Sequence, residues 1–399
     1  MRPAGNESDT LTVLTNGRIL TPYVEIKTGT AVIQGRQIVE AKPAALNDFP
    51  SSARVLNLRG LTVVPGFVDM HIHGALGADT LDAAPEAIST IARFLAKNGT
   101  TSFLPTTVSA GWEQLGKVAS AAVEAKKSNT LGAEILGLHL EGPFLNPEKR
   151  GAHNPAAIQG VDLNAVAALL HRFPGLVRVV TLAPELPGAL DCIKYMAGQG
   201  VTAAAGHTSA DFATMNAAFE AGLTHGVHLF NGMGPLHHRE PGVVGAILTR
   251  PGVTCEVIAD GHHLHPATVR LTASLKAPDD LVLVTDAMRA AGLADGQYDL
   301  GGLTVRVKDG VAKLPTGSLA GSTLTLVKAV KNAVAFTGFP LQKVVQWATV
   351  NPARVLGVSA KKGEIAAGKD ADITVLDQDF NVVLTMVRGT IVWDSLQKE

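Results

Sequence analysis

The sequence predicts an α/β fold, namely a TIM-type (β/α)8 barrel with a small β-sandwich domain formed from both termini. Eight apolar, strand-like runs alternate with Ala-rich amphipathic stretches, and β-rich segments stand on both sides of that region. No glycine-rich dinucleotide-binding motif follows the first run. The alternation favours parallel strands joined by helices and leaves a doubly wound open sheet as the alternative.

The composition is that of a globular protein with a large core. The 399 residues are 46% hydrophobic and 17% charged, and 34 basic residues nearly balance 35 acidic ones. This balance predicts no nucleic-acid partner. The chain has only two cysteines, a polar beginning without an apolar signal core, and no apolar run of about 18 residues. We therefore expect a soluble cytoplasmic protein with no membrane partner.

The two flanks predict one small domain. Residues 11–60 contain short β-like segments, with Asn16-Gly17 and Gly35 expected in the turns between them. The β pattern returns at Gly363 and continues to the end of the chain. We place the small β-domain at residues 1–62 and 359–399 and the barrel at 63–358.

Between the flanks, eight strands and their connecting helices are expected. The strands are predicted at 61–69, 99–107, 133–141, 177–185, 201–207, 225–230, 253–260 and 280–286. Helices are predicted at 83–98, 112–128, 161–173, 209–221, 266–275, 322–337 and 341–349. A β-hairpin-like insert, YDLGGLTVRVKDGVAKL, follows the eighth strand.

The ends of these strands carry the candidate chemistry. In a barrel of this kind functional residues come from the C-terminal ends of the strands. The first run ends in His71 and His73, whose side chains lie on the same face and form half of a divalent metal site. Later runs carry Glu141, His207, His228, Asp260 and Asp286 at or near their ends. One such residue is explained as a solvated strand end, but this many on one edge predict a set of nitrogen and oxygen metal ligands.

Asp286 ends the almost wholly apolar run LVLVTDAM. A buried carboxylate there needs a partner. In a metal hydrolase that partner is water activated by the metal, so Asp286 is predicted to take the proton of water and return it to the leaving group.

The chain resembles the amidohydrolase superfamily and, within it, the N-acetylglucosamine-6-phosphate deacetylase family. PGFVDMHIHG and GKDADI are motifs shared widely in the superfamily, whereas LEGPF with KRGAHNP, HLFNGM with REPG, and ADGHH are specific to the deacetylases. The matching motifs run the whole length of the chain. The resemblance implies a barrel with a small β-domain, in agreement with the pattern of strands.

The resemblance also implies roles for individual residues. Glu141, His207 and His228 would hold the catalytic divalent metal, expected to be Zn²⁺, with Fe²⁺, Co²⁺ or Mn²⁺ as alternatives. Asp286 would be the acid and base, and His153 would polarise the acetamide carbonyl. The residues matched to substrate contacts are Ala152, Asn231, Gly232, Arg239, Asp260, Gly261, His262, His263, Leu319, Ala320 and Gly321. Of these, Arg239 and His263 would anchor the phosphate, with Arg239 contributed across the interface of a homodimer.

Some alternatives stay open at this point. Members of the family bind one or two metal ions, and because His71 and His73 are present, a second ion bridged by Glu141 is chemically feasible. The expected reaction is hydrolysis of N-acetyl-D-glucosamine 6-phosphate to D-glucosamine 6-phosphate and acetate, in amino-sugar catabolism or cell-wall recycling. The alternatives are an N-acetylgalactosamine-6-phosphate deacetylase, an amidohydrolase for another amide, and a non-catalytic barrel scaffold.

Overall fold

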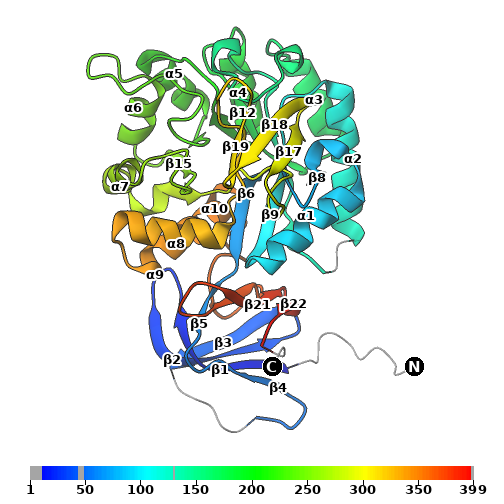
Figure 1. The fold of residues 1–399 in the computed structure, drawn as a ribbon, viewed down its shortest axis with the longest axis vertical. Helices are drawn as coiled ribbons and strands as arrows, with labels where there is room; N and C mark the ends of the chain where they lie inside the picture. The colour runs from blue at the N-terminus through cyan, green and yellow to red at the C-terminus, as the bar shows by residue number, and fades with distance from the viewer. Residues whose placement is uncertain (1–10, 44–48, 129–130, 397–399) are drawn as a thin grey trace.

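The computed structural model describes residues 11–43, 49–128 and 131–396. They form a large barrel and a smaller β-domain at one end of it (Figure 1). The predicted fold class, a parallel barrel with a small domain built from both ends of the chain, is therefore confirmed. Residues 1–10, which gave the prediction about a signal peptide, lie outside the described residues, and the exact domain limits stay a prediction.

The barrel wall consists of eight parallel strands in sequence order. These are β6 (Phe67–Ile72), β9 (Thr100–Thr107), β11 (Leu138–Glu141), β12 (Val177–Leu182), β13 (Thr202–Ala205), β14 (His225–Gly226), β15 (Thr254–Val257) and β16 (Leu281–Leu283), with the short β10 (Glu134–Ile135) also paired to β9. The first and last strands meet through a parallel bridge between Ile72 and Ala287. All eight predicted runs thus contribute to the wall, and their C-terminal ends share one edge.

Helices surround this wall (Figure 1). They are α1 (Pro85–Lys97), α2 (Trp112–Ser128), α3 (Leu163–Arg172), α4 (Ala189–Gly198), α5 (Phe212–Ala221), α6 (Gly242–Thr249), α7 (Pro266–Leu275), α8 (Leu326–Thr337), α9 (Leu341–Ala348) and α10 (Val350–Val355). α4, α6 and α10 were not among the predicted helices. α6 has the sequence GVVGAILT, and six of its eight residues are buried, so it lacks the polar face that makes a helix recognisable in a sequence.

The small β-domain is one mixed sheet in the order β22-β21-β20-β5-β1-β2-β3, with β4 paired to β1. Its strands are β1 (Leu11–Leu20), β2 (Glu25–Gln34), β3 (Gln37–Pro43), β4 (Arg54–Asn57), β5 (Thr62–Pro65), β20 (Ile373–Leu376), β21 (Val382–Val387) and β22 (Thr390–Asp394). The turn expected at Asn16-Gly17 is wrong. These residues form a bulge within β1, because Asn16 adopts a φ of 63° while the pairing with β2 continues on both sides.

The first predicted run, 61–69, divides between the two domains. β5 pairs with β1 and β20 in the small sheet, and β6 begins two residues later in the barrel wall. Gly66 makes this transition possible, because a Cβ there would lie 2.2 Å from the side chain of Thr101. A single apolar run in the sequence therefore connects the two hydrophobic cores.

The predicted insert is a three-stranded sheet, β17 (Gly296–Leu300), β18 (Leu303–Lys308) and β19 (Val311–Lys313). Its apolar face forms a separate core that includes Leu300, Val305, Val108 and Ala152. Val108 and Ala152 come from loops at the C-terminal edge of the barrel, so the insert covers part of that edge. Two further short strands, β7 (Gly74–Ala75) and β8 (Ala78–Asp79), form a small hairpin after β6.

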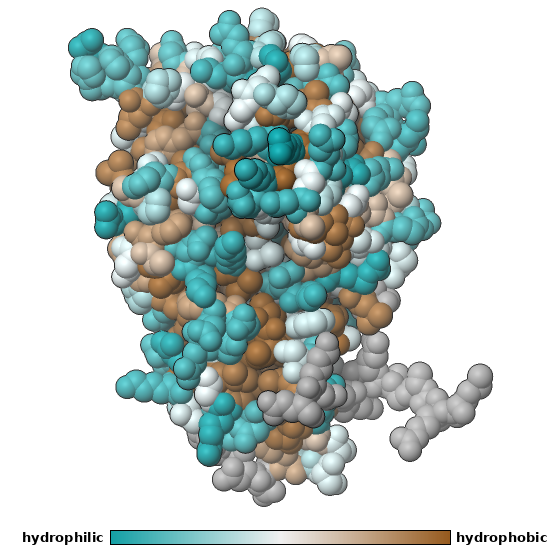
Figure 2. Space-filling model, viewed as in Figure 1, coloured by the Kyte–Doolittle hydropathy of each residue, from teal (hydrophilic) through white to brown (hydrophobic). Residues whose placement is uncertain are grey.

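The surface of the face shown in Figure 2 mixes hydrophilic and apolar side chains over the barrel. None of the helices in the described ranges is both long enough and apolar enough to cross a membrane.

Candidate metal centre and active site

The predicted site residues converge on a cavity of about 280 Å³ at the C-terminal edge of the barrel. Its wall includes twelve of the predicted residues: His73, Glu141, Ala152, His153, His207, His228, Asn231, Gly232, His263, Asp286, Leu319 and Gly321. Val108, Gly151, Leu300 and Ser318 also line the cavity and were not predicted. Strand ends far apart in the sequence thus meet in one place, as the barrel topology requires.

Glu141, the last residue of β11, lies at the centre of this cluster. Its Oε1 is 2.9 Å from His228 Nε2 and 3.1 Å from His207 Nε2. Its Oε2 is 3.3 Å from His153 Nε2 and 3.5 Å from His73 Nε2. Burial would raise the pKa of Glu141, but the surrounding imidazoles hold it well below its usual range. The group is therefore ionised and lies within 3.5 Å of the Nε2 atoms of all four rings.

Hydrogen bonds to the main chain fix the proton position on three of these rings. Each ring contacts a carbonyl oxygen through Nδ1: His207 at Lys149 (2.8 Å), His228 at Asn231 (3.1 Å) and His73 at Thr106 (3.2 Å). A carbonyl only accepts, so Nδ1 carries the proton. Nε2 is therefore the atom that faces the cavity, and a ring that gives up its proton there to bind a cation directs the remaining lone pair at the ion, as in metal-binding histidines.

His153 has the opposite arrangement. Its Nδ1 lies 3.0 Å from the main-chain N–H of Ser109 and 2.9 Å from the Ser109 hydroxyl. A main-chain N–H only donates, so Nδ1 of His153 must be the acceptor. Burial, opposed by Glu141, lowers the pKa of His153 to about 4, so the ring is neutral. The ring proton therefore sits on Nε2 and faces the cavity, where it can be donated to a substrate oxygen.

A second group of candidate ligands lies beside the first. His73 Nε2 is 3.0 Å and His71 Nε2 is 3.7 Å from Asp286 Oδ1. His71 Nε2 is buried and has no hydrogen-bond partner. Burial would raise the pKa of Asp286, but the hydrogen bond from His73 and the charges of the two rings lower it to about 2. Asp286 is therefore ionised at neutral pH.

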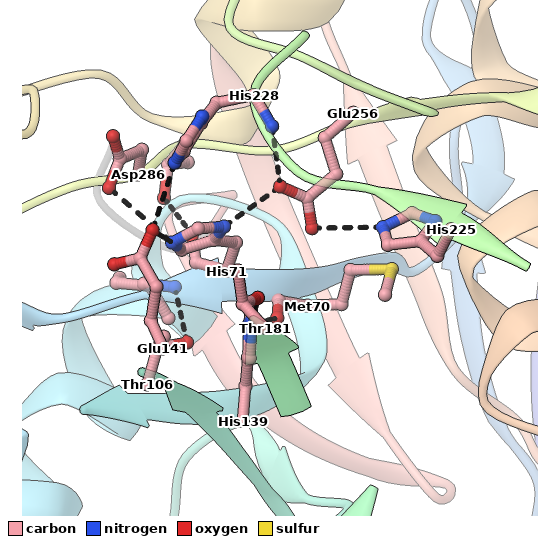
Figure 3. A network of polar contacts seen from close by, with 12 residues as sticks. Met70, His71, Thr106, His139, Glu141, Thr181, His225, His228, Glu256 and Asp286 are labelled. Carbon is pink, nitrogen blue, oxygen red and sulfur yellow. Dashed lines mark hydrogen bonds and ion pairs between the residues drawn. The ribbon is translucent and has the colours of Figure 1, made fainter. Parts of the chain in front are cut away.

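These donor sets fit divalent cations. The ligand atoms of Glu141, His207 and His228 all lie within 4.8 Å of one another, and so do those of His71, His73 and Asp286. Imidazole nitrogen and carboxylate oxygen are the ligands that zinc prefers in hydrolytic sites. The buried Nε2 of His71, which no protein group satisfies, is the atom that a cation would pair. Figure 3 shows His71, Glu141, His228 and Asp286 directed toward one another.

The backbone at this edge is strained. His207, His228 and Asp286 have positive φ values of 47°, 27° and 48°, although none is glycine. Such conformations cost of order 1–3 kcal/mol each and persist only where the surroundings enforce them. Each residue lies just beyond the end of its strand, where this turn of the chain aims its side chain at the barrel axis.

The predicted phosphate-binding residues are only partly brought together. His263 lines the cavity, and its Nδ1 lies 2.6 Å from Asp260, which also accepts from the main-chain N–H of His262. Arg239 is exposed and contacts the neighbouring His238 instead of the cavity. The remaining predicted residues outside the cavity wall are His71, Gly261, His262 and Ala320. Asp260 thus acts on the cavity through His263.

Sequence reasoning missed Glu256 and Ser109. Glu256 is fully buried, and its carboxylate contacts His71 and His225 (Figure 3). Burial would raise the pKa of Glu256, but the charge of His71 and the hydrogen bonds from the two rings hold it well below its usual range. A lone glutamate inside the apolar run VTCEVIA was the signal that could have found it. Ser109 contributes its main-chain N–H as well as its hydroxyl, and a main-chain group is one that no residue type reveals.

The comparisons with known proteins agree with this site. Residues 62–392 match the amidohydrolase family. The N-acetylglucosamine-6-phosphate deacetylase of Bacillus subtilis is 39% identical over 84% of this chain and 86% of its own length. The N-acetylgalactosamine-6-phosphate deacetylase of Escherichia coli O157:H7 is 38% identical over 89% of this chain and 93% of its own. Among solved structures, a mutant N-acetyl-D-glucosamine-6-phosphate deacetylase from Mycobacterium smegmatis, in complex with N-acetyl-D-glucosamine 6-phosphate, has a TM-score of 0.90 and 37% identity, covering 96% of this chain and 100% of that one.

Proposed function

The chain belongs to the amidohydrolase family, as its motifs predicted, and from this premise we propose that it hydrolyses N-acetyl-D-glucosamine 6-phosphate to D-glucosamine 6-phosphate and acetate. One observation carries the proposal. Three histidines hold a proton on Nδ1 and direct Nε2 toward Glu141, while His153 turns an N–H into the same cavity. Metal-assisted hydrolysis of an amide uses both, a cation site and a donor for the oxyanion.

The family is metal-dependent, and the residues that would hold the ion are Glu141, His207 and His228. A divalent cation there supplies Lewis acidity, which lowers the pKa of water. Asp286, ionised and facing the cavity, accepts a proton from the attacking water and later donates it to the departing amine. His153 donates its Nε2 proton as a hydrogen bond to the acetamide oxygen, where negative charge develops.

We assign zinc to this site because its donors are nitrogen and oxygen and its cavity stays open to substrate. His71 and His73 would hold a second ion, with Glu141 between the two positions. We also propose that the protein works in the reducing cytoplasm. The thiols of Cys192 and Cys255 are free and buried, and burial raises their pKa values to about 11 and about 12, so neither is a ready nucleophile.

The proposal is tested by measuring amine release from N-acetylglucosamine 6-phosphate and from unphosphorylated N-acetylglucosamine, with protein of known metal content. We expect a much higher kcat/KM for the phosphorylated sugar, because a protonated His263 can donate an N–H to phosphate at the cavity wall. Burial would lower the pKa of His263, but Asp260 raises it and so favours the protonated ring. Equal values for both sugars would remove the phosphate site from the proposal. No release from either by metal-loaded protein would contradict the assigned substrate.

N-acetylgalactosamine 6-phosphate is the second candidate substrate, because a relative that is 38% identical is named for it. The two sugars differ only in the orientation of one hydroxyl. The same assay with this epimer decides between them, and we expect the lower kcat/KM for the galactosamine sugar. The reverse order would reassign the substrate without changing the chemistry.

We further propose a homodimer in which Arg239 binds the substrate phosphate of the partner subunit. Arg239 is exposed and lies outside the cavity wall of its own chain. Arg239→Ala is expected to raise KM for the phosphorylated sugar at least about 10-fold, since a charge-assisted contact contributes about 1.5–3 kcal/mol. The matched control is Arg250→Ala, which removes another exposed arginine, paired to Glu220, and should leave KM unchanged.

Subunit mixing tests whether Arg239 acts across the interface. Arg239→Ala subunits mixed with Asp286→Asn subunits should regain activity, because a mixed dimer contains one site with both groups intact. Exchange is verified by differential tagging of the subunits. If exchanged dimers regain nothing, Arg239 acts within its own chain or not at all.

A further inference from the structure

Glu256 lies in the barrel interior on β15, below the cavity, and is 0% exposed. Its Oε2 is 2.8 Å from His71 Nδ1 and 3.1 Å from the main-chain N of His228. Its Oε1 is 3.2 Å from Nε2 of His225, whose Nδ1 lies 2.6 Å from the Thr254 hydroxyl. Figure 3 shows this line of contacts running from Asp286 and His71 through Glu256 to His225. Neither Glu256 nor His225 reaches the cavity.

We propose that Glu256, supported by His225, is the positioning residue that prepares His71 to bind a second divalent cation next to the Glu141 site. This inference rests on the proposed metal-dependent function. It goes beyond that function by assigning the second site a dedicated buried carboxylate on a strand that contributes no ligand of its own.

The hydrogen-bond chemistry of His71 supports the assignment. A carboxylate only accepts, so the Nδ1 of His71 donates to Glu256, and Nε2 is the ring atom left to bind a cation. That Nε2 is buried without a partner, 3.6 Å from Glu141 and 3.7 Å from Asp286. A carboxylate behind a histidine fixes the ring and raises its basicity as a ligand, as in carboxylate–histidine–zinc triads.

The other candidate ligand histidines have neutral carbonyls behind them. His73, His207 and His228 each donate from Nδ1 to a main-chain oxygen. His71 alone among these four has a full negative charge in that position, and the charge lies where no water reaches it. Burying Glu256 in an apolar barrel is costly unless cationic or donor groups repay it. A cation bound at Nε2 of His71 would supply positive charge that offsets this cost through the ring of His71.

The test is a Co²⁺ titration of metal-stripped protein, followed by calorimetry and by the visible absorption of the bound ion. Wild-type protein is expected to take two Co²⁺ ions per chain, and His71→Asn one. Glu256→Gln keeps the size of the side chain and an acceptor oxygen but removes the charge. We expect it to keep the tighter ion and to raise the Kd of the second ion about 10- to 100-fold.

Glu185→Gln is the matched control. Glu185 is another carboxylate at this edge, accepting from Asn146 and from the main-chain N of Ser209, but it contacts neither His71 nor His73. The Kd of the second ion in the Glu185→Gln protein should equal that in the wild type. His225→Gln leaves Glu256 in place and removes its outer support, so a smaller increase is expected. This variant provides the test if Glu256→Gln does not fold.

Three outcomes would overturn the inference. The first is a wild-type Kd for the second ion in both the Glu256→Gln and His225→Gln proteins. The second is a single ion bound by the wild type. The third is loss of both ions from a folded Glu256→Gln protein, which would make Glu256 a support of the whole centre rather than of His71. None of these readouts uses deacetylase activity, so the proposed reaction can fail or succeed separately.

Discussion

Asp286→Asn is expected to lower kcat about 10²- to 10⁴-fold, the range typical for loss of a general acid–base group. The asparagine side chain occupies the same space but cannot accept a proton from water or return it to the amine. Substrate contacts and the ligands Glu141, His207 and His228 are untouched, so KM and the tighter metal ion should be retained. The measurement is steady-state amine release together with the metal content of the same sample.

Asp260→Asn is the control for this variant, because it changes a carboxylate in the loop after the neighbouring strand β15, paired to His263 at 2.6 Å. It is expected to raise KM for the phosphorylated sugar more than it lowers kcat, because Asp260 acts through a predicted phosphate-binding residue. Near-normal turnover of metal-loaded Asp286→Asn protein would remove the assignment of Asp286 as acid and base.

The barrel and most of the cavity wall could be predicted because both depend on local pattern and topology. Strand-like runs that end in His73, Glu141 or Asp286 place these side chains on one edge of any (β/α)8 barrel. The C-terminal ends of all strands lie at one edge of such a barrel. His73 and Asp286, which are 213 positions apart, therefore come within 3.0 Å of each other. Predicting that these residues lie together requires only the fold class and no detail of side-chain packing.

The proton positions could not be predicted, because main-chain groups decide them. The N–H of Ser109 requires the proton of His153 to be on Nε2, whereas the carbonyl of Lys149 requires a proton on Nδ1 of His207. The same residue type therefore has two opposite roles a few ångströms apart. Of the 13 histidines in the sequence, five lie together here, and no local pattern of residues shows on which nitrogen each carries its proton.

The division of the first run had a similar cause. Residues 61–69 read as one strand, since both halves are apolar and β-branched. The run divides into two strands at Gly66, whose main-chain N–H donates to the carbonyl of Asp372 in the small domain at 2.8 Å. A long-range contact with residues some 300 positions away decided the break, and no local pattern contains it.

The junction between the two domains holds a second buried charge cluster, centred on Lys362. Its Nζ lies 2.6 Å from Asp372, 2.7 Å from Glu134 and 3.2 Å from Asp370. Glu134 belongs to β10 in the barrel, whereas Asp370 and Asp372 precede β20 in the small sheet. The three carboxylates have the spacing of a metal site, but the lysine ammonium already lies in contact with all three. Burial would lower the pKa of Lys362, yet Asp372 and Glu134 raise it well above its usual value.

Lys362→Met is therefore expected to reduce the free energy of unfolding by about 3–5 kcal/mol, because it leaves buried carboxylates without their cation. Denaturant titration at neutral pH measures the change. Burial raises the pKa of Asp372 while Lys362 lowers it, so without the lysine that pKa rises further. The folded variant then binds more protons than the unfolded chain, and its stability falls as the pH rises.

The stability deficit of Lys362→Met should accordingly be larger at pH 8 than at pH 5. Lys117→Met is the matched control. Its ammonium also lies 2.7 Å from a carboxylate, that of Glu113, but both side chains are exposed, and such pairs contribute little to stability. We expect no clear change in its unfolding midpoint. Equal effects of the two substitutions, or a deficit that does not depend on pH, would show that the buried cluster does not hold the two domains together.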